Sequence, residues 1–191
     1  MRRWLVAIVA VTSTSALLAG CSTSLTSVPL CTRPDDNLFV LEAQAVPSAT
    51  LLPCVEILPI GWSFGGSLVQ SDRARFWLDS DRAGIHAVEV DLRRSCDVSR
   101  AVVVPPAPGE TTVKVFEEPT SLPPAFAGIR YSVFPGGCIT YRYRFKAGAP
   151  STLALEAVGA LGTLPREVMV RLVAHNVDLI LCGAGAPPCA G

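Results

Sequence analysis

The chain has 191 residues, half of them hydrophobic, and its 16 basic residues balance 16 acidic ones. Only 17% of the residues are charged, which excludes a strongly basic nucleic-acid-binding tail and an acidic disordered segment. Length and apolar content are typical of one globular domain. The seven cysteines are the feature of the composition that needs an explanation.

The first 20 residues have the pattern of an export signal. Arg2 and Arg3 precede an apolar run from Trp4 to Leu18, which hydroxyl residues interrupt at positions 12–15. Such a run is too short to cross the hydrocarbon core of a membrane as a stable helix. We therefore expect residues 1–20 to be a signal peptide and not part of the fold.

The segment closes with Leu18-Ala19-Gly20-Cys21. These four residues resemble the lipobox of bacterial lipoproteins. The resemblance implies that the Cys21 sulfur receives a diacylglyceryl group, that cleavage precedes Cys21, and that two or three acyl chains such as palmitate anchor the protein without a spanning helix. We expect a location on the extracytoplasmic face of the cell membrane. The alternative is an ordinary secreted protein in which Cys21 is a free thiol.

Residues 21–30 are rich in serine and threonine and carry no charge, which suits a tether. Residues 31–191 are then a single globular extracytoplasmic domain. Loss of Arg2 and Arg3 with the signal leaves a small negative net charge. The mature chain therefore has no electrostatic reason to coat nucleic acid.

The cysteines other than Cys21 are even in number, as in the disulfide framework of an exported domain. Fifteen connectivities are formally open to six cysteines. Order along the chain favours the pairs Cys31–Cys54, Cys96–Cys138 and Cys182–Cys189. The chain has neither a C-x-x-C motif nor a Cys/His pair at zinc-like spacing, so we expect no metal and no cofactor.

Most of the chain after residue 62 alternates between apolar and polar residues, which is typical of half-buried strands. Pro135-Gly136-Gly137 is the expected turn between two of them, and the proline-rich residues 105–108 and 119–124 are expected loops. The predicted strands cover residues 73–78, 86–93, 111–117, 129–134 and 138–145, with 62–69 as a candidate sixth.

Helices are predicted after residue 150. Ser151 or Thr152 suits the start of a first helix that Gly162 ends, and Pro165 suits the start of a second. The second helix has an apolar stripe made of Val168, Met169, Leu172 and Val173. Residues 38–45 fit either a helix or a strand, and we favour a helix.

Strands followed by helices predict an α+β fold, in which an antiparallel sheet of five to six strands has two C-terminal helices packed on one face and is stapled by disulfides. One sheet face is expected to form the core against the helices. Its side chains are Phe76, Leu78, Val88, Val90, Tyr141, Tyr143 and Phe145.

One sequence motif points to an enzyme. Ser63 lies in a G-x-S-x-G pattern, and His175 with Asp97 or Asp178 would complete a catalytic triad. A nucleophile elbow requires a helix directly after the serine, whereas two glycines and an alternating segment follow Ser63. Ser63 and His175 are therefore secondary candidates.

The turn at residues 79–84 resembles the start of a calcium loop, because Asp79 and Asp81 occupy its first and third positions and Gly84 its sixth. The ligands required at positions five and twelve are missing, since Ala83 and Val90 stand there. A hairpin turn with Asp side chains bonded to the backbone is the interpretation that we favour.

A second candidate site is basic. Arg142, Arg144 and Lys146 share one face of a predicted strand, and Arg130 lies across the expected turn from them. Such a row would bind phosphate, sulfate or an anionic cell-wall polymer. The alternative, which we favour, is that the row pairs with the acidic residues Glu89 and Asp91 on neighbouring strands.

Residues 76–84, 134–138 and 181–189 resemble an uncharacterised domain of proteins exported by high-GC Gram-positive bacteria, a resemblance that implies no activity. The leading hypothesis is a non-enzymatic, membrane-anchored domain that binds an envelope protein or a cell-wall component. The alternatives are a small envelope serine hydrolase that uses Ser63, or a lipid or small-molecule carrier with a cavity behind Tyr141 and Tyr143.

Overall fold

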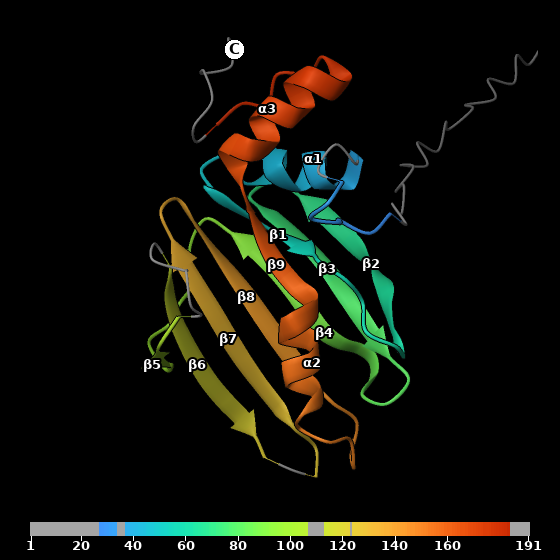
Figure 1. Ribbon diagram of the computed structural model, residues 1–191. Coiled ribbons are helices and arrows are strands. Elements are labelled where there is room, and N and C mark those ends of the chain that lie inside the picture. The colour runs from blue at the N-terminus through green and yellow to red at the C-terminus, as the bar shows by residue number, and fades with distance from the viewer. Residues whose placement is uncertain (1–26, 34–36, 107–112, 123, 184–191) are drawn as a thin grey trace, which may run out of the picture.

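The computed structural model describes residues 27–33, 37–106, 113–122 and 124–183. Within them the fold is α+β, as predicted, with three helices and a large antiparallel sheet (Figure 1). The sheet has seven strands in the order β2-β3-β4-β8-β7-β6-β5. Their bounds are β2 Trp62–Gln70, β3 Arg73–Ser80, β4 Gly84–Arg93, β5 Val102–Val104, β6 Lys114–Ser121, β7 Ala127–Phe134 and β8 Gly137–Arg144.

All five predicted strands and the candidate sixth are present, and two details differ from the prediction. The three exposed or half-exposed valines of β5 add a seventh strand that has no alternation to reveal it. In addition, β6 continues through Pro119, which was expected in a loop. There β6 extends past the short β5, and proline is tolerated at such an edge because its missing N–H has no strand to bond.

A second, two-stranded sheet pairs β1 (Leu51–Val55) with β9 (Leu161–Pro165). The helices are α1 (Asn37–Ala45), α2 (Leu153–Ala160) and α3 (Arg166–Val177), so the preferred helix at the N-terminal end is confirmed. As predicted, the first of the C-terminal helices ends before Gly162 and Pro165 stands at the start of the second, but the residues between them form β9, which was not expected. Backbone pairing with β1, from a distant part of the sequence, holds this segment extended.

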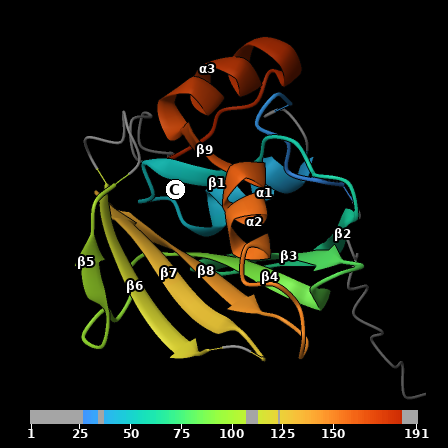
Figure 2. The same cartoon turned by 60° about the horizontal axis from the view of Figure 1, so that its bottom comes forward.

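The helices and the β1–β9 pair lie on one side of the large sheet, which bends so that β5 and β6 rise beside them (Figure 2). We call the sheet face toward them the inner face. All seven residues expected in its core are buried. Of the two C-terminal helices, α2 lies over the sheet, whereas α3 lies beyond the β1–β9 pair with buried Met169 and Val173. The predicted packing of both helices on the sheet is thus only roughly matched.

Two predicted disulfides are present, Cys31–Cys54 and Cys96–Cys138. Cys182 is also disulfide-bonded, and its predicted partner Cys189 lies outside the described residues. The expected signal peptide, Cys21 and most of the expected tether lie outside them as well. The end of that tether already contacts the fold, since Leu30 forms a bridge with Val55. Among the described helices, none is long and apolar enough to span a membrane.

Candidate functional site

The outer face of the sheet carries paired charges. Arg142 donates to Glu89 over 2.6 Å, and the buried Asp91 carboxylate accepts two hydrogen bonds from Arg73, at 2.8 and 2.7 Å, and one from Arg93 at 3.1 Å. Acidic and basic rows therefore alternate across neighbouring strands, as we favoured. Three arginines, Arg73, Arg93 and Arg142, thus share two carboxylates, and each of the three is already engaged by an acidic side chain of this face.

The four cations proposed as an anion site do not converge. Arg142 lies on the outer face, Arg144 is exposed at the end of β8, and Lys146 donates to the Asp81 carbonyl oxygen over 2.8 Å. Arg130 lies opposite Tyr141 in the β7–β8 register, so its side chain is on the inner face. The expected neighbourhood of Arg130 and Arg142 is corrected, because residues one position apart in register point to opposite faces.

Ser63 lies on an exposed position of β2, and strand follows it instead of a helix. It pairs in register with Asp79, whose carboxylate accepts the backbone N–H of His86 over 2.6 Å. His175 lies in α3, where its ring contacts the side chain of the neighbouring Asn176 at 3.0 Å. In the described part of the chain no hydrogen bond joins Ser63 to either histidine, so these residues do not form a triad as they stand.

The turn at residues 79–84 follows the hairpin interpretation. The Asp79 carboxylate is bonded to backbone, and Ser80 accepts backbone N–H groups of Arg82 and Ala83, both at 3.3 Å. The described residues contain no group of three or more histidine, cysteine or acidic side chains placed to hold a metal ion.

A groove of about 330 Å³ lies on the inner face between α2 and strands β6 and β7. This volume falls at the lower end of the range of small-molecule sites. Its apolar walls include Phe126, Leu155 and Val158, of which Leu155 is 75% exposed. We call it the α2 groove; Gly128, Tyr143, Ser151, Ala154, Glu117 and Arg130 also line it.

A glycine opens the floor of the α2 groove. Gly128 lies directly opposite Tyr143 in the β7–β8 register, and an ordinary residue there would place its side chain above the sheet. A Cβ built on Gly128 lies 3.7 Å from the nearest atoms, which belong to Phe126 and to the Glu118 backbone. The position therefore has room for a side chain and leaves that room empty.

Tyr143, which lines the α2 groove, has a hydroxyl without a hydrogen-bond partner. Its ring is buried and packs edge-on against Phe145, with ring centroids 6.3 Å apart. Its hydroxyl is buried without a hydrogen bond. Burial raises the pKa of Tyr143 well above that of an exposed tyrosine, so the hydroxyl keeps its proton and is a donor. An unpaired buried hydroxyl costs free energy that a ligand acceptor would recover.

The charges beside the α2 groove are already balanced. Arg130 donates to the Glu117 carboxylate over 2.6 Å. Glu118 accepts the Tyr131 hydroxyl over 3.2 Å and lies 3.4 Å from Arg100. The lining therefore combines apolar walls, Tyr143 and the Arg130–Glu117 ion pair, whereas the Glu118 carboxylate lies with Tyr131 on the outer face.

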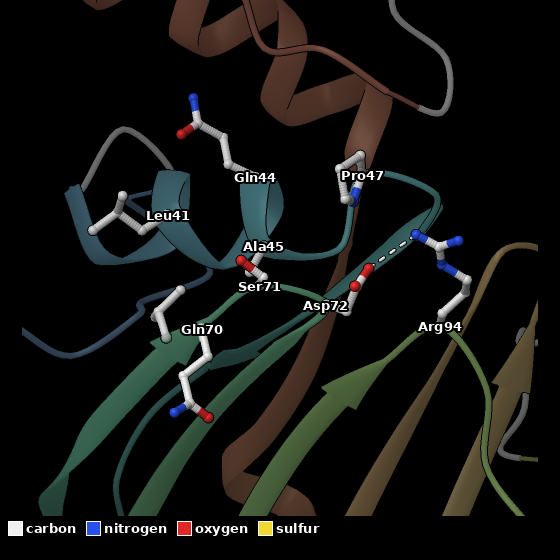
Figure 3. A pocket seen from close by; sticks show the side chains of 9 residues that line it. Leu41, Gln44, Ala45, Pro47, Gln70, Ser71, Asp72 and Arg94 are labelled. Atoms are coloured by element: carbon white, nitrogen blue, oxygen red, sulfur yellow. Dashed lines mark hydrogen bonds and ion pairs between the residues drawn. The ribbon is translucent and has the colours of Figure 1, made fainter.

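A second pocket, of about 480 Å³, lies between α1 and the β2–β3 turn. Figure 3 shows Leu41 on one side and the Asp72–Arg94 ion pair on the other. Both partners of that pair, 2.9 Å apart, are mostly exposed, and none of the described buried polar atoms without a partner belongs to this pocket. The α2 groove is therefore the better candidate site.

Comparisons with protein-family models, with curated proteins and with solved structures found no match to this chain. The site consequently stands on its own geometry. Sequence reasoning placed Tyr143 on the face behind which a carrier would have its cavity. It missed Gly128 and Glu117, although a glycine inside an apolar strand signals open space or close approach.

Proposed function

We propose that the chain is a membrane-anchored extracytoplasmic domain that binds a small amphipathic ligand in the α2 groove. The observation that carries the proposal is the buried, unpaired hydroxyl of Tyr143 in a groove with apolar walls. Ligand sites typically combine apolar lining with a few polar groups that fix orientation. The proposal joins the binding-domain hypothesis to the carrier alternative.

Gly128 offers a direct test of binding in the α2 groove. Gly128→Val adds a branched side chain to the floor, at a position with ordinary contact distances and in a strand that favours valine. We expect the variant, in a Cys21→Ser background, to fold and to lose binding of the uncharged apolar dye Nile red. Gly159→Val is the control, because it adds the same side chain to α2 where nothing lies within 4 Å. Equal dye binding by both variants would refute the site.

The proposed anchor rests on Leu18-Ala19-Gly20-Cys21. Because the acyl chains would be attached to the Cys21 sulfur, Cys21→Ser is expected to move the protein from the membrane to the soluble fraction. Ser22→Ala is the matched control and is expected to leave the protein at the membrane. Retention of the Cys21→Ser chain in membranes would contradict anchoring through lipid.

A further inference from the structure

The Arg130–Glu117 pair bears on which head group the α2 groove accepts. The two side chains project from neighbouring positions of β7 and β6, paired in register on the inner face. Arg130 is about three-quarters buried, and its guanidinium donates to Glu117 over 2.6 Å. Arg130, the cation among the residues that line the groove, is therefore already paired with a carboxylate of the same lining.

An anionic head group in the α2 groove would meet two obstacles. It would compete with Glu117 for Arg130, and it would stand close to the Glu117 charge in a partly buried setting where screening by water is reduced. The neighbouring Glu118 does not change this balance, because its carboxylate is on the outer face, where Tyr131 and Arg100 engage it. An uncharged head group meets neither obstacle.

An uncharged head group would also have a hydrogen-bond donor for its oxygen atoms, the Tyr143 hydroxyl. The Tyr143 hydroxyl keeps its proton and donates to no described group. An ester, amide or hydroxyl oxygen of the ligand would accept that hydrogen bond. The ligand's apolar chain would lie against Phe126, Leu155 and Val158.

We propose that Glu117 is a specificity-determining residue, which makes the α2 groove selective for uncharged amphiphiles over anionic ones by holding Arg130. This inference rests on the proposed ligand-binding function. In this role Glu117 acts on the charge of the ligand's head group and is not a contact for its apolar chain. Discrimination built from an unfavourable charge is a common way to reject a competing ligand.

Monolaurin and laurate test the proposal, because they share one acyl chain and differ in the charge of the head group. The protein is the Cys21→Ser chain, and affinities are measured by calorimetry near neutral pH below the micelle-forming concentrations. We expect monolaurin to bind at least about tenfold more tightly than laurate. In Glu117→Gln, which frees Arg130, laurate affinity is expected to rise about tenfold with monolaurin affinity nearly unchanged.

Two further variants separate selectivity from general effects. Glu167→Gln makes the same change of charge on an exposed part of α3, where Glu167 pairs with Arg171, and should leave the preference unaltered. Adding Arg130→Gln to Glu117→Gln should abolish the gain for laurate. A wild-type preference for laurate, or an unchanged ratio in Glu117→Gln, would overturn the role of Glu117 with the binding function intact. Failure of both amphiphiles to bind would overturn the binding function itself.

Discussion

Gly128 lies directly opposite Tyr143 across the β7–β8 pair, and its missing side chain leaves open the position beside the tyrosine on the inner face. A residue of ordinary size at position 128 would help to fill the gap between the sheet and α2. The glycine and the tyrosine with the unpaired hydroxyl are thus cross-strand neighbours on the sheet face that the described helices cover (Figure 2). Their coincidence is the basis of the proposed ligand site.

The Tyr143 hydroxyl is expected to lower the free energy of unfolding and to raise the affinity for the ligand. Tyr143→Phe removes a buried hydroxyl that has no partner, so the free energy of unfolding should rise by about 1 kcal/mol. Affinity for an uncharged amphiphile should fall about tenfold, because the donor is lost. Urea titration and calorimetry measure the two effects.

Tyr131→Phe is the matched control for that change. The Tyr131 hydroxyl donates to Glu118 over 3.2 Å, so its removal should lower the free energy of unfolding by about 1 kcal/mol. Opposite signs for the two variants are the expected outcome. A loss of stability in Tyr143→Phe equal to that in Tyr131→Phe would mean that the Tyr143 hydroxyl has a partner.

Gly136 is required by the turn between β7 and β8. Its φ of 76° is unfavourable for other residues, and a Cβ there would lie 1.9 Å from the Ser48 carbonyl oxygen. Gly136→Ala should therefore lower the free energy of unfolding by more than the roughly 1–2 kcal/mol that the backbone conformation alone costs. Gly148→Ala isolates that cost, because Gly148 has a φ of 83° with nothing within 4 Å. If urea denaturation shows that both variants lose the same free energy of unfolding, the contact with Ser48 does not contribute.

Glu156 makes stability depend on pH. Hydrogen bonds from Arg82 and from the Trp62 indole hold the pKa of Glu156 below its ordinary value. A depressed folded-state pKa stabilises the fold above the ordinary carboxyl range, and the effect is lost as pH falls through the folded pKa. The difference in melting temperature between wild type and Glu156→Gln should thus shrink as the pH falls below about 5.

The exposed Glu167 provides the comparison for Glu156. It lies 3.6 Å from Arg171 on the surface of α3, and ion pairs of that kind contribute little. Glu167→Gln should leave the melting temperature nearly unchanged at neutral pH. If the difference in melting temperature between wild type and Glu156→Gln stays constant down to acid pH, the hydrogen bonds to Glu156 do not stabilise the fold.

The third disulfide remains a prediction. Cys182 is disulfide-bonded, and its pairing with Cys189 follows from chain order. Peptide mapping of the mature chain without reduction should find Cys182 and Cys189 in one linked peptide and no free thiol among the six cysteines after Cys21. A titratable thiol at Cys189 would contradict the predicted framework.

The β-sheet was largely predictable because its strands alternate, as in the buried Phe76 and Leu78 of β3. Chain order also predicted the disulfides Cys31–Cys54 and Cys96–Cys138. The β1–β9 pair was not predictable, because each strand depends on backbone bonds to a segment far away in the sequence and contains a proline. Local pattern carries no information about such a pairing.

The charged pair beside the candidate site was not predicted, because the turn between β7 and β8 is one residue shorter than expected. A three-residue loop at Pro135-Gly136-Gly137 would set Arg130 opposite Arg142. The structure instead has a two-residue turn in which Phe134 pairs with Gly137, and this register sets Arg130 opposite Tyr141 on the inner face. A shift of one residue moves a whole strand's side chains to the other face. The charged pair beside the α2 groove follows from that turn.

Mapping of ligand contacts by nuclear magnetic resonance tests the central claim most directly. Monolaurin is titrated into the ¹⁵N-labelled Cys21→Ser chain, and backbone amide shifts are followed by residue. Binding in the α2 groove predicts saturable shifts at Gly128, Arg130 and Leu155, with Trp77 and Asp91 on the outer face unchanged. The absence of saturable shifts, or shifts confined to the outer face, would contradict the account.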